Sequence, residues 1–331
     1  MIRTALRIAL AAVGLALLLG AAAFLAYRPR HWRTPEAVAV AGAGSAALRV
    51  DVESFPPFRS RSHAEALRAM EALVSKRVQD AGWTVSAQDV RRDANPHVHR
   101  TSDDPVTHNL LAVRGAGGGV RPILLGAHLD SVSASPGGDD DGSAVAVLLD
   151  LARRLEPAAA GRVELCFFNE EEAGLLGSYT FVASLPAAER ARIERVFVLD
   201  MVGGYDSAPH SQTYPPPLSW MAPDRGDFLS AIALTDADAA VAALREARER
   251  FAPALPIEMF EPPRVVANRL RDLWRSDHGP FWEAGIPAVF LTDTGNFRSQ
   301  RYHTAADVPG ALDYAKLALV ADLLAAVVAG R

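Results

Sequence analysis

Helical and strand-like patterns alternate along most of this chain. In the segment 62–82, apolar residues recur every three or four positions, which predicts an amphipathic helix. Ser62 and Glu65 have the spacing of a capping box, so we expect them to close the first turn of that helix. Apolar positions predict further helices in three segments, 142–155, 236–251 and 311–330.

Between these helices lie short apolar runs of strand length. They fall in six segments: 83–90, 108–114, 122–130, 163–168, 195–200 and 286–292. Strands separated by helices predict an α/β fold, here a three-layer α/β/α sandwich with a mixed, largely parallel central sheet. Ligands of such sheets bind at the carboxyl ends of the strands, so chemistry is expected there.

The N-terminus differs from the rest. Residues 8–27 carry no charge and are long enough to span a bilayer as a helix, although a cleaved signal peptide is the alternative. We expect a membrane anchor or signal segment in 1–30, a linker of small residues in 31–47, and one domain in 48–331. We expect the domain to be exported, to the periplasm or the cell exterior, and held at the membrane through the N-terminal helix if that segment is not cleaved.

Composition narrows the function classes. The 331 residues carry a formal net charge of −5 and show no basic cluster, which argues against a nucleic-acid partner. The single cysteine, Cys166, lies in an apolar strand and is expected to be inert core. No G-x-S-x-G nucleophile motif occurs, so serine hydrolase chemistry is unsupported.

Acidic residues and histidines follow the predicted strands at five places. The stretches are "HLDS" (128–131), "NEEEAGLLGS" (169–178), "LDM" (199–201), "SDH" (276–278) and "RYHTAADVP" (301–309). A run of three aspartates, Asp139 to Asp141, adds further negative charge just before the helix at 142. Carboxylates and imidazoles are the ligands of zinc and similar ions, and a pair of such ions would offset the crowded acids.

These motifs, with "PGGDDDGSA" (136–144) and in this order, resemble the zinc-dependent aminopeptidase family. That family contains secreted bacterial leucine aminopeptidases, glutamate carboxypeptidases and, more distantly, glutaminyl cyclases. The resemblance covers roughly residues 108–309. It implies a metallo-exopeptidase, foremost an aminopeptidase that hydrolyses N-terminal residues from peptides through a metal-activated bridging water. It also implies two Zn2+ per chain, or another divalent transition metal.

The resemblance also implies a role for each matching residue. The metal ligands would be His128, Asp140, Glu172, Asp200 and His303. Asp140 would bridge the two ions, with His128 and Asp200 on one and Glu172 and His303 on the other. Glu171 would be the general base, and Tyr302 would stabilise the oxyanion or only pack beside the site. Asp130 would orient His128.

Four further residues are expected to support the site without binding metal. Asp277 and His278 match the "SDH" stretch and are expected behind the ligands or in the pocket. Asp139 and Asp141 are expected to form the turn and the cap of the helix at 142. The long, Pro-rich segment 205–228 follows Asp200 and is expected to shape the pocket, with Tyr214, Trp220 and Met221 as candidate lining residues.

Three alternatives remain open at this point. A carboxypeptidase for acidic C-terminal residues would use basic pocket residues such as Arg225, Arg298 or Arg301. A glutaminyl cyclase would bind a single zinc. A binding module without catalysis would keep the fold alone.

Overall fold

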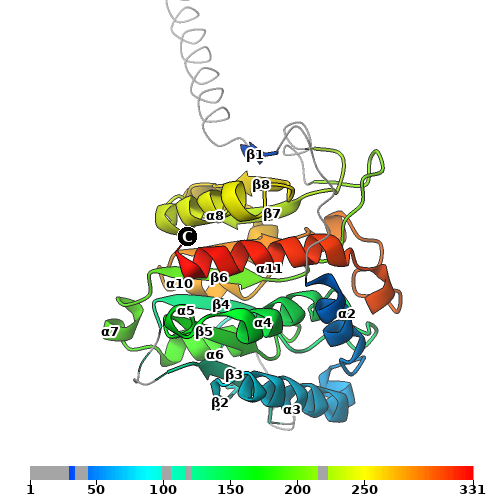
Figure 1. Cartoon of the computed structure of the whole chain (residues 1–331). Helices are drawn as coiled ribbons and strands as arrows, with labels where there is room; N and C mark the ends of the chain where they lie inside the picture. The colour runs from blue at the N-terminus through cyan, green and yellow to red at the C-terminus, as the bar shows by residue number, and fades with distance from the viewer. Residues whose placement is uncertain are drawn as a thin grey trace, which may run out of the picture.

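The computed structural model describes residues 30–33, 44–98, 106–115, 119, 121–214 and 223–330. A sheet of nine strands runs through the middle of the molecule in the order β1-β8-β7-β9-β6-β4-β5-β3-β2 (Figure 1). Its strands are β1 (Arg30–Trp32), β2 (Thr84–Asp89), β3 (His108–Val113), β4 (Ile123–His128), β5 (Val163–Phe168), β6 (Arg195–Leu199), β7 (Leu229–Ala233), β8 (Ile257–Phe260) and β9 (Ala288–Thr292).

The central strands β5, β4, β6 and β9 run parallel to one another. Toward one edge β3 and β2 pair antiparallel, and toward the other β7 and β8 run opposite to β9, with β1 antiparallel to β8 at the edge. The predicted mixed sheet is therefore confirmed, with its parallel part in the centre. Parallel strands need both faces covered, which the next layers provide.

Helices lie on both faces of this sheet (Figure 1). The α-helices are α2 (Ser45–Glu53), α3 (Ala64–Asp80), α4 (Gly142–Arg154), α5 (Pro157–Ala160), α6 (Leu176–Ser184), α7 (Ala187–Arg190), α8 (Asp238–Phe251), α9 (Arg264–Ala267), α10 (His278–Glu283) and α11 (Tyr314–Ala329). Short 3-10 helices are η1 (Arg61–His63), η3 (Arg271–Trp274), η4 (Gly295–Phe297) and η5 (Pro309–Ala311). Side chains of α2, α3, α4, α8 and α11 share one core with the sheet, and those of α6 and α10 share the other.

The strand sequences explain the two cores. Successive side chains of a strand point to opposite faces, and both faces are covered here, so apolar residues occur without interruption. In β5, Leu165 and Phe167 enter the core under α4 and α11, whereas Cys166 and Phe168 enter the core under α6 and α10. Cys166 is a buried free thiol, as expected.

Two details differ from the sequence-based expectation. The segment 31–47 was expected to be a linker, but β1 lies at its start and α2 begins at Ser45. The capping box is wrong, because His63 is the N-cap residue of α3 and makes no side-chain cap bond. The Ser62 hydroxyl instead contacts Ser60 Oγ at 2.9 Å and His63 Nδ1 at 3.3 Å.

The expected membrane-spanning or signal segment, residues 8–27, lies outside the described residues. Among the residues that are described, no helix has the length and apolar character needed to cross a membrane.

Candidate metal and active site

The acidic side chains gather where the central strands end. His128 is the last residue of β4, Asp200 follows β6 directly, and the triplet Glu170–Glu172 follows β5 after one residue. The triplet Asp139–Asp141 precedes α4, and His303 lies in the loop between β9 and α11. Parallel strands end at one edge of the sheet, which brings these five segments together.

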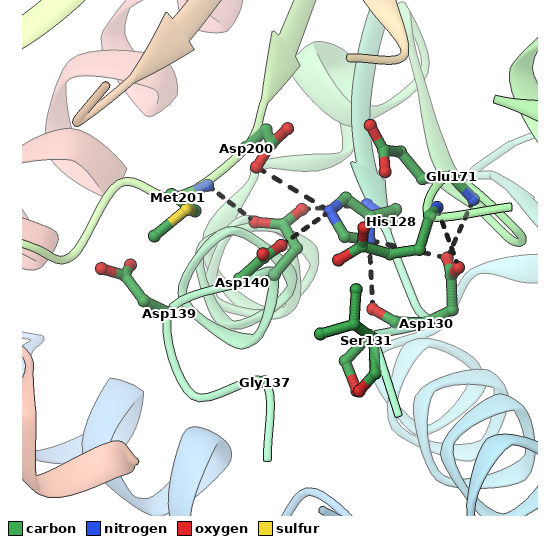
Figure 2. Close-up of polar contacts among 12 residues, drawn as sticks. His128, Asp130, Ser131, Gly137, Asp139, Asp140, Glu171, Asp200 and Met201 are labelled. Carbon is green, nitrogen blue, oxygen red and sulfur yellow. Dashed lines mark hydrogen bonds and ion pairs between the residues drawn. The ribbon is translucent and has the colours of Figure 1, made fainter. Parts of the chain in front are cut away.

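Two groups of potential ligands share Asp140. His128, Asp140 and Asp200 form one group, and Asp140, Glu172 and His303 form the other; within each group the ligand atoms lie within 4.8 Å of one another. The two oxygens of Asp140 face different groups: Oδ1 lies 3.2 Å from His128 Nε2, and Oδ2 lies 3.2 Å from His303 Nε2. The five residues expected as metal ligands are thus brought together. Figure 2 shows three of them, His128, Asp140 and Asp200.

The remaining contacts complete each group. His128 Nε2 is 3.8 Å from Asp200 Oδ1, and His303 Nε2 is 3.2 Å from Glu172 Oε1. His128 Nε2 and Glu172 Oε1 are buried, yet neither has a hydrogen-bond partner among the described residues. Buried polar atoms without partners are costly unless another group satisfies them. A metal ion in each group would satisfy both atoms, and the imidazole and carboxylate donors suit zinc.

The charges of the site are strongly coupled. Although burial opposes ionisation, the contacts with His128 and His303 hold the pKa of Asp140 well below its usual range. Burial and the neighbouring Asp140 raise the pKa of Glu172 to about 7. Burial opposes the charged form of His303, but Asp140 and Glu172 raise its pKa to about 9. This excess of negative charge is what a cation would relieve.

Asp130 links the first histidine to the second acidic triplet. Its carboxylate oxygens accept the backbone N–H groups of Glu171 and Glu172, both at 3.1 Å. His128 Nδ1 lies 3.1 Å from the backbone oxygen of Asp130 and 3.5 Å from Oδ1 (Figure 2). Asp130 therefore positions His128 largely through its main chain, while its carboxylate fixes the loop that carries Glu171 and Glu172.

The side chains of Asp139 and Asp141 make no cap hydrogen bond with α4. Asp141 precedes the helix but makes no cap bond; its carboxylate accepts the N–H groups of His128 at 2.9 Å and Met201 at 3.1 Å. Asp139 accepts the N–H of Gly203 at 2.9 Å. Asp141 does occupy the N-cap position of α4 and Asp139 lies in the turn before it, as expected, but their side chains instead bond to the end of β4 and to the loop after β6.

Glu170 points away from the ligands. It accepts a hydrogen bond from Thr107 Oγ1 at 2.6 Å and forms an ion pair with Arg61. Glu172 rather than Glu170 faces His303, as the register of the "EEAGLLGS" motif predicted.

Glu171 lies between these two neighbours and lines a cavity of about 500 Å³ that also reaches Asp140 and His303. Its side chain is buried, and burial raises its pKa well above the usual value of a glutamate. A buried carboxyl group next to a candidate metal centre has the position of a general base.

Tyr302 also lines the cavity, but its hydroxyl is already engaged. It accepts a hydrogen bond from Arg275 at 2.9 Å, and its ring stacks on His303 with centroids 3.7 Å apart. The stacking orients the histidine. Stabilisation of an oxyanion by Tyr302 stays a prediction.

Asp277 and His278 lie behind the ligands, as expected. Asp277 accepts a hydrogen bond from Ser178, and burial raises its pKa to about 7. His278 contacts the backbone oxygen of Leu273 at 2.7 Å and stacks on Phe290. Burial lowers the pKa of His278 to about 4, so it is a neutral core residue.

The segment 205–228 reaches the cavity, as expected. Tyr214 lines the cavity, and Thr213 N–H donates to the backbone oxygen of Phe297 at 2.8 Å. Trp220 and Met221, the other two candidates, lie outside the described residues.

Arg59, a buried arginine next to the site, was not predicted from the sequence. Its guanidinium donates to the backbone oxygens of Leu129, Pro136 and Gly137 at 2.8 to 2.9 Å. Its side chain is almost fully buried, and the acidic groups of the site oppose the lowering of its pKa by burial. Arg59 follows no motif, so only the fold reveals that it supports the segment between β4 and the Asp139–Asp141 triplet.

Comparisons with known proteins identify the family of the chain. The model of "Peptidase family M28" matches residues 109–328. The Uncharacterized protein YfbL of Escherichia coli K12 is 32% identical over 275 residues, which cover 80% of each chain. BSAP, a zinc aminopeptidase from Bacillus subtilis, is 25% identical in a structural match that covers 69% of this chain and 51% of that one, with a TM-score of 0.50.

A second solved structure shares the fold. A glutaminyl cyclase from Porphyromonas gingivalis is 20% identical, and the match covers 86% of this chain and 98% of that one with a TM-score of 0.59. This likeness shows the fold alone. The fold therefore accommodates different reactions, and the side chains of the site have to distinguish them.

Proposed function

The chain belongs to peptidase family M28, and we propose that it is a zinc-dependent aminopeptidase that removes N-terminal residues from peptides. The observation that carries the proposal is the pair of ligand groups that share Asp140 and lie beside Glu171 in one cavity. The similarity to a zinc aminopeptidase from Bacillus subtilis supports the choice of metal and reaction.

We assign two ions per chain. His128 and Asp200 would hold one ion, Glu172 and His303 the other, and Asp140 both. Each ion would have three protein ligands, which leaves coordination positions for water and substrate. Zinc bound there supplies Lewis acidity for the peptide carbonyl and lowers the pKa of a bound water.

The protein groups divide the remaining work. Glu171 accepts the proton of the attacking water and passes it to the nitrogen of the departing peptide. Burial raises the pKa of Glu171 well above the usual value of a glutamate, which strengthens the carboxylate as a proton acceptor. Asp130 fixes the backbone of Glu171 and Glu172 relative to His128. The scissile carbonyl and the base are thereby held in one geometry.

The basic residues argue against a carboxypeptidase for acidic C-terminal residues. Arg298 donates to Gln212, Gly204 and Phe228, Arg225 donates to the backbone oxygen of Ser207, and neither residue lines the cavity. Among the described residues that line the cavity, the arginine present is Arg275. Its guanidinium donates hydrogen bonds to Asn296 and Tyr302.

A cyclase is disfavoured by the second ligand group. Five ligand side chains, with a carboxylate shared between two groups, exceed what a single ion needs. A non-catalytic module is disfavoured because Glu171 stands buried beside both groups.

We also propose that the catalytic domain is exported from the cytoplasm. The uncharged segment 8–27 supports export of the domain, anchored in a membrane or released after cleavage.

Hydrolysis by the purified full chain tests the reaction. We expect zinc-loaded protein to cleave L-leucine p-nitroanilide and to release the first residue of a peptide whose amino group is free. Acetylation of that amino group should abolish cleavage, and 1,10-phenanthroline should abolish both reactions until zinc is restored. Cleavage from the carboxyl end, or ammonia release from a glutaminyl peptide without hydrolysis, would contradict the proposal.

A further inference from the structure

The cavity extends from the ligand groups onto one face of β7, β8 and β9. Ser230 of β7 pairs with Thr292 of β9 and with Glu258 of β8, which forms a polar row across the three strands. Two residues further along β7, Ile232 lies between Phe290 and Phe260, which forms an apolar row. All six side chains line the cavity.

The polar row lies nearest the ligand groups. Thr292 ends β9, and the N–H of the ligand Asp200 donates to the backbone oxygen of the preceding Leu291 at 3.1 Å. Glu258 lies two strands away from Thr292, at about 10 Å given the usual spacing of strands. A side chain that enters the cavity from the ligand groups therefore passes between the row of Thr292 and Ser230 and the adjoining apolar row, and meets the carboxylate of Glu258 at its far end.

The negative charge of Glu258 is offset by two basic side chains, one on the edge strand β1 and one directly after it. Its side chain is 6% exposed. His31, directly opposite Glu258 in the ladder, contacts Oε2, and Arg33 Nε donates to Oε1 at 3.1 Å. Burial raises the pKa of Glu258, and the contacts with His31 and Arg33 oppose that shift. Both carboxylate oxygens are thus occupied, one by His31 of β1 and the other by Arg33, the residue after β1.

Arg33 is itself held in place. Its guanidinium donates to both carboxylate oxygens of Asp227, at 3.2 and 2.9 Å. Asp227 precedes Phe228, which lines the cavity. Arg33 therefore connects two parts of the pocket wall. The family model matches residues 109–328, so β1 lies outside the matched region.

An acidic group in an apolar pocket selects for a cation unless the protein supplies one. We propose that His31 and Arg33 set the charge preference of the substrate pocket: by occupying both oxygens of Glu258, they make it accept an uncharged, apolar side chain and disfavour a cationic one. This inference rests on the proposed function, because it takes the cavity to receive the side chain of the N-terminal residue.

The p-nitroanilides of L-norleucine and L-lysine form a matched pair for the test, since their side chains share a four-carbon stem and differ in the terminal ammonium group. The readout is the ratio of kcat/KM for lysine to kcat/KM for norleucine. Wild type should prefer norleucine. In the double variant His31→Gln/Arg33→Gln, Glu258 is released, and the ratio should rise by about tenfold or more.

Two controls separate charge from strand integrity. Arg30 lies on the same strand but pairs with Glu261, so Arg30→Gln should change the ratio by less than about twofold. In a Glu258→Gln background, the His31→Gln/Arg33→Gln substitutions should no longer raise the ratio. A rise of the same size there, or an unchanged ratio in the double variant with zinc content and melting temperature retained, would overturn the proposal.

The single variant Glu258→Gln keeps the inference testable if the double variant does not fold. Since the carboxylate is already occupied, its loss should change the ratio by less than about threefold. A fall of the ratio by more than about tenfold would mean that Glu258 serves cationic substrates in the wild type, and would overturn the proposal.

Calorimetry with the free amino acids L-norleucine and L-lysine separates this inference from the proposed function. If the zinc-loaded protein cleaves neither anilide, the proposed function fails, while the ratio of the two dissociation constants still reports the charge preference. If the anilides are cleaved without the expected ratios, this inference alone fails. Binding of neither amino acid would also overturn it.

Discussion

Two acidic triplets, Asp139–Asp141 and Glu170–Glu172, lie at the same sheet edge, and in neither triplet do all three carboxylates have the same kind of partner. One carboxylate of each triplet faces a histidine of the ligand groups: Asp140 between His128 and His303, and Glu172 against His303. The neighbouring residues, identical in type, have other partners. Position within a run of like residues therefore says little about role.

The partners of the remaining carboxylates differ between the triplets. The short side chains of Asp139 and Asp141 accept backbone N–H groups of Gly203, His128 and Met201. The longer Glu170 reaches the side chains of Arg61 and Thr107. The outer residues of the aspartate triplet thus fix the backbone around Asp140, whereas the glutamate triplet carries the proposed base and a candidate ligand on a loop held by Asp130.

Substitution of the shared carboxylate should have the largest effect. In Asp140→Asn, both ligand groups lose a charged oxygen, so we expect loss of both zinc ions and a fall in kcat/KM of at least about ten-thousandfold. Metal analysis and kinetics measure this. The matched control is Asp139→Asn, which should keep its zinc; equal zinc loss in both variants would show that the triplet does not divide as described.

Substitution of the base should come next. Glu171→Gln preserves shape and removes the proton acceptor, so kcat should fall by about a hundred- to ten-thousandfold with zinc content unchanged. Activity close to that of the wild type would remove Glu171 from the mechanism.

Glu170→Gln should affect stability instead of chemistry. It removes the charge of Glu170 from a largely buried ion pair with Arg61, which should lower the free energy of unfolding by about 1 to 3 kcal/mol while kcat changes by less than about tenfold. Urea unfolding and kinetics measure the two effects. Loss of zinc in this variant would mean that Glu170 and Glu172 are not separate in role.

The pH dependence of stability should be smaller and should depend on metal. In the metal-free protein, the pKa values of Glu172 and Asp277 are raised to about 7 and that of His303 to about 9. At pH values between the ordinary pKa of each group and its raised pKa, the folded state binds more protons than the unfolded state. The free energy of unfolding therefore falls as pH rises through this range. Urea unfolding with a chelator should give a lower free energy of unfolding at pH 9 than at pH 6.

Zinc should reverse this trend, because it replaces the protons on its ligands and binds more tightly as pH rises. The stabilisation by added zinc should therefore be greater at pH 9 than at pH 6. A chelated protein that is more stable at pH 9 would contradict the coupling of these groups.

Three of the candidate ligand segments could be located from the sequence because they lie at the ends of buried strands. His128, Asp200 and the glutamate triplet follow six-residue or five-residue apolar runs that are easily recognised. The short strands β1, β7 and β8 were not predicted, and β1 becomes a strand by pairing with β8. Partners distant in sequence also went unseen, such as Arg59 beneath the aspartates and Asp141 on Met201. Such contacts depend on the fold and have no local pattern.

The most direct test of the account is the zinc content of the full chain, purified without chelator and titrated with zinc. A carboxylate-bridged pair of ligand groups predicts two tightly bound ions per chain in the wild type. A content of one ion or none, persisting after zinc is added back, would contradict the shared role of Asp140 and with it the proposed centre.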